Sequence, residues 1–181
     1  MLLLKRFDRE GADRVPFLSA MSMLGAKDNE TRSYLELVDA LRQHGASARQ
    51  DMEALWRRLV FIILISNMDD HLRNHGFLYA GASGWRLSPA YDLNPVPADI
   101  KPRILTTAIN EDDTTASLQV ALDTANYFGL AAKNARAIAA EVGAAVARWR
   151  NEAETVGLTK SQTDRMASAF EHEDLAPALK G

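Results

Sequence analysis

The stretch Leu59-Val60-Phe61-Ile62-Ile63-Leu64-Ile65 is the longest unbroken apolar run in the chain. The segment before it starts with Ser47-Ala48-Arg49-Gln50, which has the Ser-x-x-Gln form of a helix capping box, and it stays amphipathic up to Arg57-Arg58. A helix that is apolar on every side is buried on every side, so this pattern predicts a long helix at the centre of the core. A buried strand is the alternative for the seven apolar residues, but the length of the segment and its capped start favour the helix.

Helical patterns flank this central segment on both sides. Apolar residues at helical spacing predict one helix after Thr31, one over residues 118–125 and a longer one that reaches Trp149. Thr159-Lys160-Ser161-Gln162 is a second capping-box pattern and predicts the start of the last helix. The sequence therefore predicts helices over most of residues 16–66 and 117–171.

Extended segments are short in this chain. Residues 76–80 and 85–87 predict the two strands of a hairpin, because a Gly-rich turn joins two apolar stretches there. Residues 1–9 predict a further apolar strand, and Pro16 suits the first turn of a short helix. No repeat or linker interrupts the pattern, so we expect one mainly α domain over residues 1–181 with a short central β-hairpin.

The composition excludes several classes of protein. The 181 residues include 21 Lys and Arg against 24 Asp and Glu, a net charge of −3, which argues against broad binding to nucleic acids or membrane surfaces. The absence of cysteine excludes disulfides, thiolate metal sites and a cysteine nucleophile. The longest apolar run is far shorter than the ~20 residues of a membrane span, and the apolar start is too short for a signal peptide. We therefore expect a cytoplasmic protein.

The polar segment Asn67-Met68-Asp69-Asp70-His71-Leu72-Arg73-Asn74-His75 stands out from its surroundings. It holds two carboxylates, two imidazoles, a guanidinium and two amides, and it joins the most apolar helix to the hairpin. Catalytic groups often sit on such loops, where a rigid scaffold holds polar residues. A plain solvated turn is the alternative interpretation. We expect Asp70 to face solvent and His75 to cap the hairpin.

The spacing of three residues points to phosphoryl transfer. Asp69 and Asn74 are related as in the Asp-x-x-x-x-Asn of a kinase catalytic loop, where the Asp positions the acceptor hydroxyl and the Asn holds a metal ion. Asp92 follows the hairpin, between Tyr91 and an apolar residue, as the metal-binding Asp of kinases does. Carboxylate and amide oxygens suit Mg²⁺ bound together with substrate phosphates. His71 and Arg73 would then donate hydrogen bonds to phosphate oxygens.

A metal-dependent phosphohydrolase is an alternative function for the same residues. Its two-metal site needs carboxylates and imidazoles around ions that lie ~4 Å apart. The candidate ligands would be Asp69, Asp70, His71, His75 and Asp92. Such sites usually gather ligands from several elements, whereas most of these residues come from one loop.

Four ordered motifs resemble the HipA family of bacterial serine/threonine kinases, the toxins of HipBA toxin–antitoxin modules. The loop Asn67-x-Asp69-x-His71-x-Arg73-Asn74 is similar to the family's Asn-x-Asp-x-His-x-Lys-Asn, with Arg in place of Lys. The other three motifs are Arg6-Phe7-Asp8-Arg9, the stretch from Pro16 to Met21 with Ser33-Tyr34-Leu35-Glu36, and the segment Leu87-Ser-Pro-Ala-Tyr-Asp92-Leu. The likeness runs from about Leu2 to about Trp149 and implies the helical C-terminal lobe of a protein-kinase-like fold.

The resemblance also implies the roles of single residues, with ATP and Mg²⁺ as cofactors. Asp69 would be the catalytic base for a Ser or Thr hydroxyl of a protein substrate, and Asn74 and Asp92 would hold Mg²⁺. Residues 1–9 would form the hinge strand that meets the adenine, and residues 67–93 would form the catalytic loop, the hairpin and the metal-binding segment. The implied nucleotide-binding residues are Lys5, Arg6, Phe7, His71, Leu72, Arg73, Asn74, Tyr91 and Asp92.

The resemblance leads to two further expectations, about activity and about a partner. The resemblance places a Gly-rich loop and a strand-borne Lys before the Arg-Phe-Asp-Arg motif, and only five residues precede Arg6 here. We therefore expect this chain by itself to be inactive without an N-terminal lobe. The resemblance also implies a HipB-like antitoxin as a possible partner. A non-catalytic module that binds an antitoxin or a complementing lobe is the alternative function.

Overall fold

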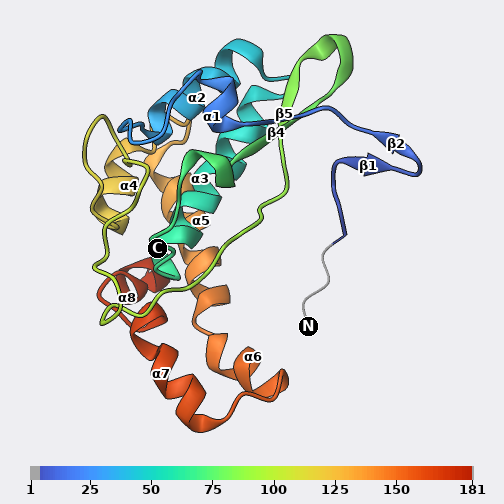
Figure 1. Cartoon of the computed structure of the whole chain (residues 1–181). Helices are drawn as coiled ribbons and strands as arrows, with labels where there is room; N and C mark the ends of the chain where they lie inside the picture. Colours follow the sequence, from blue (N-terminus) through green and yellow to red (C-terminus); the bar gives the residue numbers. More distant parts are fainter. Residues whose placement is uncertain (1–4, 181) are drawn as a thin grey trace.

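The computed structural model describes residues 5–180, and it consists mainly of helices with two small antiparallel sheets (Figure 1). The helices are α1 (Ala20–Met23), α2 (Tyr34–His44), α3 (Ala48–Leu64), α4 (Leu118–Thr124), α5 (Ala132–Val146), α6 (Trp149–Thr155), α7 (Lys160–Phe170) and α8 (Leu175–Lys180). The strands are β1 (Arg9–Glu10), β2 (Asp13–Arg14), β3 (Phe17–Ser19), β4 (Gly76–Tyr79) and β5 (Trp85–Leu87). Two single 3₁₀ turns are η1 (Leu72–Asn74) and η2 (Gly81–Ser83). The mainly α fold class is confirmed.

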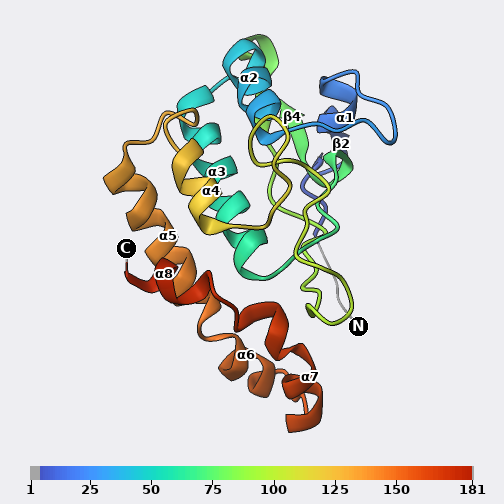
Figure 2. The same ribbon diagram turned by 90° about the vertical axis from the view of Figure 1, so that its left-hand side faces the viewer.

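Helix α3 forms the centre of the core, as its apolar run predicts. Leu59, Ile62 and Ile63 have no exposed surface, and α3 packs against α2, α4 and α5. The helix begins at Ala48 as expected, but Ser47 makes no side-chain cap hydrogen bond. Residues 59–64 lie within α3, so the alternative of a buried strand is wrong. Figures 1 and 2 show α6 and α7 at one end of the molecule and the β4–β5 hairpin at the other.

The predicted hairpin is confirmed and gains a third strand. β4 pairs with β5, and η2 forms the turn between them. β3 pairs with the other edge of β4, with Phe17 opposite Leu78 and Ser19 opposite Gly76. A Cβ at Gly76 would lie 2.3 Å from the Phe17 ring, so a larger residue here would displace that ring.

The N-terminal segments differ from the sequence-based expectations. Residues 17–19 form β3 rather than a helical turn after Pro16, because their backbone pairs with β4, and α1 starts only at Ala20. The strand predicted over residues 1–9 is wrong for residues 5–8, which form no strand. Its residues 1–4 lie outside the described part of the chain. Arg9–Glu10 pairs with Asp13–Arg14 in the β1–β2 hairpin.

The C-terminal helices also differ in two places. The helix predicted to reach Trp149 ends at Val146, and Trp149 starts α6, where its ring stacks on Phe170 at 4.5 Å between centroids. α7 begins with the predicted capping box of Thr159 and Gln162. The sequence pattern missed α8, which packs on α5 at Gly143, where an added Cβ would lie 3.0 Å from the Cβ of Ala178. No helix of the described residues is long and apolar enough to cross a membrane.

Candidate functional site

The polar loop of residues 67–75 starts directly at the end of α3. The N–H of Ser66 donates to the carbonyl of Ile63 at 3.2 Å, and the N–H of Asn67 donates to the carbonyl of Ile62 at 3.0 Å. Ser66 has φ of +52°, so these bonds form a Schellman-type helix end with serine at the left-handed position. Glycine usually occupies this position, so the sequence carries no signal for it. This helix end fixes the direction in which the loop leaves α3.

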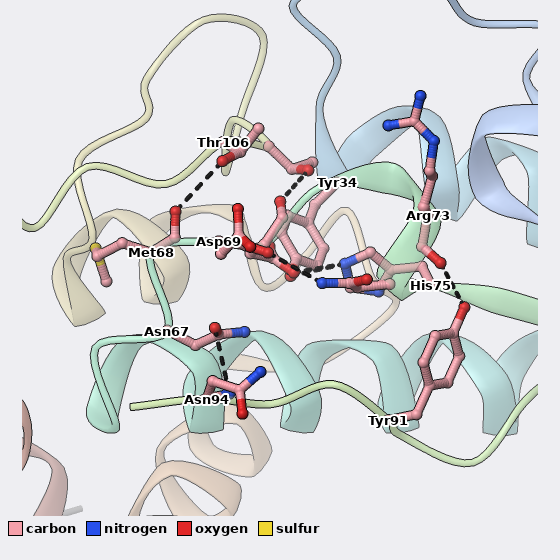
Figure 3. Close-up of polar contacts among 12 residues, drawn as sticks. Tyr34, Asn67, Met68, Asp69, Arg73, His75, Tyr91, Asn94 and Thr106 are labelled. Atoms are coloured by element: carbon pink, nitrogen blue, oxygen red, sulfur yellow. Dashed lines mark hydrogen bonds and ion pairs between the residues drawn. The ribbon is translucent and has the colours of Figure 1, made fainter. Parts of the chain in front are cut away.

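Four carbonyl groups of the loop accept hydrogen bonds from side chains (Figure 3). The carbonyl of Met68 accepts from the Lys101 ammonium at 3.0 Å and from the Thr106 hydroxyl at 3.3 Å. The other three bonds run from Asn74 Nδ2 to Asp69 at 3.0 Å, from the Thr107 hydroxyl to Asp70 at 2.6 Å, and from the Tyr91 hydroxyl to Arg73 at 2.6 Å. The segment of residues 101–107 therefore holds the loop from one side, and Tyr91 holds it from another.

The two adjacent carboxylates of the loop have opposite surroundings. Asp69 is exposed, whereas Asp70 has no exposed surface, so the prediction that Asp70 faces solvent is wrong. Asp70 accepts a hydrogen bond from the Tyr34 hydroxyl at 2.6 Å and lies 2.8 Å from Nε2 of His75. His75 is buried too, and its ring meets Tyr34 edge-on. Asp70 and His75 thus anchor the loop, and Asp69 is the carboxylate that solvent can reach.

Asn74 links the candidate base to the candidate metal site. Its side chain is buried, and its amide nitrogen is occupied by the carbonyl of Asp69. Because the amide nitrogen only donates hydrogen bonds, Oδ1 of Asn74 is the atom that could coordinate a cation. The bond fixes the two residues of the Asp-x-x-x-x-Asn pattern relative to each other.

Asp92 sits in a strained backbone conformation beside this loop. It is exposed and has φ of +55°, a value that non-glycine residues adopt at a cost of about 1–3 kcal/mol. The Asn94 side chain donates to Oδ1 of Asp92 at 2.8 Å, and the Asn94 N–H lies 3.4 Å from Oδ1 of the buried Asn67. The Val96 N–H donates to the carbonyl of Ser66 at 3.1 Å. These bonds join the segment of Asp92 to the end of α3.

An aromatic cavity of about 530 Å³ lies next to Tyr91. The rings of Phe7, Phe17 and Tyr91 surround it, with centroids 5.6 Å apart for Phe7 and Tyr91 and 6.1 Å apart for Phe7 and Phe17. Lys5, Arg6, Asp8, Pro89 and Ala90 complete its lining. Arg6 and Asp8 form an ion pair at 2.5 Å at this cavity. The structure thus brings Lys5, Arg6 and Phe7 together with Tyr91 at one cavity, and their contact with a nucleotide stays a prediction.

The remaining predicted phosphate contacts lie at a different cavity. His71, Leu72 and Arg73 line a space of about 320 Å³ between the loop and residues 27–32. The Leu72 side chain is buried, and the Arg73 guanidinium pairs with Asp28. Figure 3 shows the Arg73 side chain and Tyr91 on opposite sides of the loop. These three residues therefore do not share the aromatic cavity in this structure, and their contact with a nucleotide stays a prediction.

Comparison with known proteins places the chain in a family. The sequence profile of the HipA-like C-terminal domain matches residues 1–149. The chain belongs to the family of HipA-like C-terminal domains.

Individual relatives of this HipA-like domain agree with the assignment. A Haemophilus influenzae protein named "Putative kinase" is 31% identical over 77 residues, which is 41% of this chain and 22% of that protein. A Sinorhizobium fredii protein named "Putative kinase Y4dM" is 36% identical over 95 residues, 51% of this chain and 23% of that protein. The matches thus span less than a quarter of each curated relative.

A solved structure shares the fold of the HipA-like domain. It is the Shewanella oneidensis complex of the toxin–antitoxin proteins HipA and HipB with operator DNA. The TM-score is 0.69 at 17% sequence identity, and the match covers 97% of this chain and 46% of the solved chain. At this identity the likeness establishes the fold, which is the expected C-terminal part of a HipA kinase-like fold.

The oxygen atoms present in the HipA-like domain fit a magnesium ion that is bound together with phosphates. Oδ1 of Asn74 and Oδ2 of Asp92 are hard donors, and Mg²⁺ in such sites takes only one or two protein carboxylates besides substrate oxygens. Within residues 5–180 no group of three or more His, Asp or Glu side chains is placed to hold a metal. Asp70 and His75 are occupied with each other and with Tyr34, which disfavours the two-metal phosphohydrolase.

The electrostatics of the site keep its tyrosines protonated. Burial, followed by the nearby Asp70 charge, raises the pKa of Tyr34 well above its usual value. Partial burial also raises the pKa of Tyr91, against the opposing effect of Arg58. Both hydroxyls therefore remain donors at neutral pH, which is the role each has in holding the loop.

Thr107 is a supporting residue that the sequence motifs do not reveal. It lies 37 residues beyond Asp70, is buried, and donates at 2.6 Å to the carbonyl of Asp70. We expect Thr107→Val, which keeps the shape but loses the donor, to lower the free energy of unfolding by about 1–3 kcal/mol because a buried carbonyl loses its partner. Thr106→Val is the matched control: Thr106 is an exposed residue and its hydroxyl makes a longer bond of 3.3 Å, so urea unfolding should show a smaller loss. Equal losses would contradict the anchoring role of Thr107.

Proposed function

We propose that this HipA-like domain is the C-terminal lobe of an ATP- and Mg²⁺-dependent serine/threonine protein kinase. The observation that carries the proposal is the pairing of an exposed Asp69 with a buried Asn74, whose amide group holds the backbone of that same Asp69. The base and the metal ligand are five positions apart in kinase catalytic loops as well. The hydrogen bond from Asn74 to the carbonyl of Asp69 explains this spacing, because it fixes the base and the metal ligand relative to each other, and both must act on one phosphoryl group.

Each polar residue then has a role. Asp69 accepts the proton of the substrate hydroxyl, for which it needs an accessible carboxylate on a fixed backbone. Asn74 and Asp92 would hold Mg²⁺ through their oxygens, and the ion would supply positive charge against the developing phosphate charge. Asp70, His75 and Thr107 do no chemistry in this scheme, but they hold the loop in the conformation that it requires.

The aromatic cavity is the proposed adenine site. Its volume of about 530 Å³ falls in the range of small-molecule sites, which are mostly apolar and carry few polar groups. Phe7, Phe17 and Tyr91 supply flat apolar faces, and Lys5 and Arg6 are among the other lining residues. Tyr91 connects this cavity to the loop through its bond to the carbonyl of Arg73.

The names of the relatives support the proposed kinase function and suggest a partner for this domain. Two relatives carry kinase names, and the solved neighbour is a toxin in complex with an antitoxin and operator DNA. We propose a protein with a Ser or Thr acceptor as the substrate, a HipB-like antitoxin as the partner, and the cytoplasm as the location. DNA contact would belong to such an antitoxin. Phosphoryl transfer is proposed for this lobe together with an N-terminal lobe that covers the phosphates.

A titration with ATP tests the metal roles. We expect Asn74→Ala and Asp92→Ala each to weaken binding of Mg·ATP at least about tenfold, which is the loss that follows when a ligand's supporting residue alone is removed. Binding of ATP in EDTA should change little in either variant, because the aromatic cavity stays intact. Asp123→Ala on the exposed face of α4 is the control and should bind like the original chain. Equal Mg·ATP affinity in all these proteins would overturn the assigned metal roles.

A further inference from the structure

A largely buried ion pair lies at the end of α3, outside the groups that the proposed kinase chemistry uses. Nη2 of Arg103 donates to a carboxylate oxygen of Asp174 at 2.7 Å, and only 14% and 11% of these two side chains are exposed. The carboxylate of Glu173 lies 3.7 Å from Nη1 of Arg103 and is exposed, so Asp174 is the main partner of this guanidinium.

The same region of the fold supplies partners for the last carbonyl groups of α3, which have none within the helix. Nη2 of Arg103 also donates to the carbonyl of Ile63 at 3.1 Å, and this carbonyl accepts the N–H of Ser66 as well. Nε2 of His172 lies 3.1 Å from the carbonyl of Leu64. The connection between α7 and α8 therefore lies against the end of α3 from which the polar loop leaves (Figures 1 and 2).

His172 also contacts the backbone of Asp174, which orders the residues between α7 and α8. Nδ1 of His172 lies 3.4 Å from the backbone nitrogen of Asp174. Burial, followed by the positive charge of Arg103, lowers the pKa of His172, so the imidazole is neutral at neutral pH. A neutral ring with its proton on Nε2 donates to Leu64 and accepts from Asp174, which agrees with both distances.

Arg103 lies in the middle of the segment of residues 101–107, which holds the polar loop. Side chains on both sides of Arg103 donate to the carbonyl of Met68, the residue before Asp69. The second half of the loop has a further anchor in the buried side chain of Asp70. The position of the first half, and therefore of Asp69, depends on how firmly residues 101–107 are fastened.

We propose that Asp174 is a positioning residue for the polar loop of residues 67–75 and that it acts through Arg103. The carboxylate fixes the guanidinium by a charge-assisted hydrogen bond, and the guanidinium fixes both the end of α3 and the segment of residues 101–107. Asp174 lies beyond residues 1–149, which the family profile matches. The consequence for Asp69 as a base rests on the proposed kinase function, whereas the effect on the loop does not.

Hydrogen exchange of single amides in the whole chain tests this role without a nucleotide. The N–H of His71 donates to the carbonyl of Asp69 at 3.1 Å, so its exchange reports on that part of the loop. The N–H of Leu59, in the middle of α3 and fully buried, reports on opening of the core. Asp174→Ala should raise the exchange rate at His71 at least about tenfold more than at Leu59. A rise at His71 no larger than at Leu59 would overturn the proposal.

Two further variants separate the ion pair from the other contact of the same carboxylate. Oδ1 of Asp174 accepts from the N–H of Leu118 at the start of α4 at 2.9 Å. Asp174→Asn keeps an oxygen for this N–H but removes the negative charge, so exchange at His71 should rise while the Leu118 amide stays protected. In the double variant of Arg103→Met and Asp174→Ala, exchange at His71 should be no faster than in the faster single variant, because both changes break one interaction. Additive effects would mean that the two residues act separately and would overturn the assignment.

Glu171→Gln is the matched control in the same connection between helices. Glu171 binds Arg150 at 2.5 and 3.0 Å in an exposed ion pair, so its change should leave exchange at His71 as it is in the original chain. A rise comparable to that in Asp174→Ala would contradict a specific role of Asp174.

Titration with Mg·ATP supplies a second readout that depends on the proposed function. Asp174→Ala should weaken binding severalfold, because the carbonyl of Asp69 holds the amide group of Asn74. Unchanged affinity in this variant, beside an original chain that binds Mg·ATP, would overturn the positioning role. An original chain that does not bind Mg·ATP would contradict the proposed kinase function instead, and the exchange rates at His71 would decide on Asp174.

Discussion

Asp70→Ala is expected to lower the free energy of unfolding by about 2–6 kcal/mol, because two buried polar groups each lose a hydrogen-bond partner at a cost of about 1–3 kcal/mol. Asp70 has no exposed surface and bonds to Tyr34 at 2.6 Å and to His75 at 2.8 Å. The alanine variant removes the carboxylate that both the buried Tyr34 hydroxyl and the buried His75 imidazole contact. Urea unfolding followed by far-UV circular dichroism measures the loss.

The neighbouring residue supplies a matched control for this prediction. Asp69 is exposed, and its carboxylate has no hydrogen bond or ion pair among the described residues. Asp69→Ala should therefore change the free energy of unfolding by no more than about 0.5 kcal/mol. Asp70→Asn keeps an acceptor for the Tyr34 hydroxyl and should fall between the two alanine variants. Equal losses for the two alanine variants would contradict the division of the loop into one anchoring and one accessible carboxylate.

Trp56→Ala should destabilise the HipA-like domain by about 3–5 kcal/mol, as expected when a large side chain is removed from a core. Trp56 has no exposed surface, and its indole N–H donates to the carbonyl of Ala121 at 3.3 Å, which joins α3 to α4. Because α3 carries the polar loop at its end, the loss should also raise hydrogen exchange of the loop amides. Thermal unfolding together with hydrogen exchange checks both results.

Trp149→Ala is the control for the core prediction. This indole is only partly buried, stacks on Phe170 and lies under the Arg150 guanidinium at the end of the molecule formed by α6 and α7. Its removal should cost no more than about half of the loss at Trp56, and exchange in the loop of residues 67–75 should not change. A comparable loss, with faster exchange in that loop, would contradict the central role given to α3.

The sequence predicts the elements whose pattern is local. The apolar run of residues 59–65, the hairpin turn and the capping box at Thr159 each depend on neighbours within a few residues, and all three are confirmed. β3 and α8 depend instead on distant partners. Three residues after Pro16 become a strand because β4 offers an edge, and the short α8 is held by its packing against Gly143 of α5.

The candidate site also has features that the sequence predicts and features that only the tertiary structure shows. The sequence by itself determined the family, the Asp-x-x-x-x-Asn pattern and the aromatic residues near Asp92, because residue type and spacing can be seen along the chain. Only the tertiary structure decided that Asp69 is accessible while Asp70 is buried, and that Arg73 turns toward Asp28. The physical reason is distance along the chain. Tyr34 and Thr107 reach Asp70 from 36 and 37 residues away, and no local pattern of polar and apolar residues encodes such contacts.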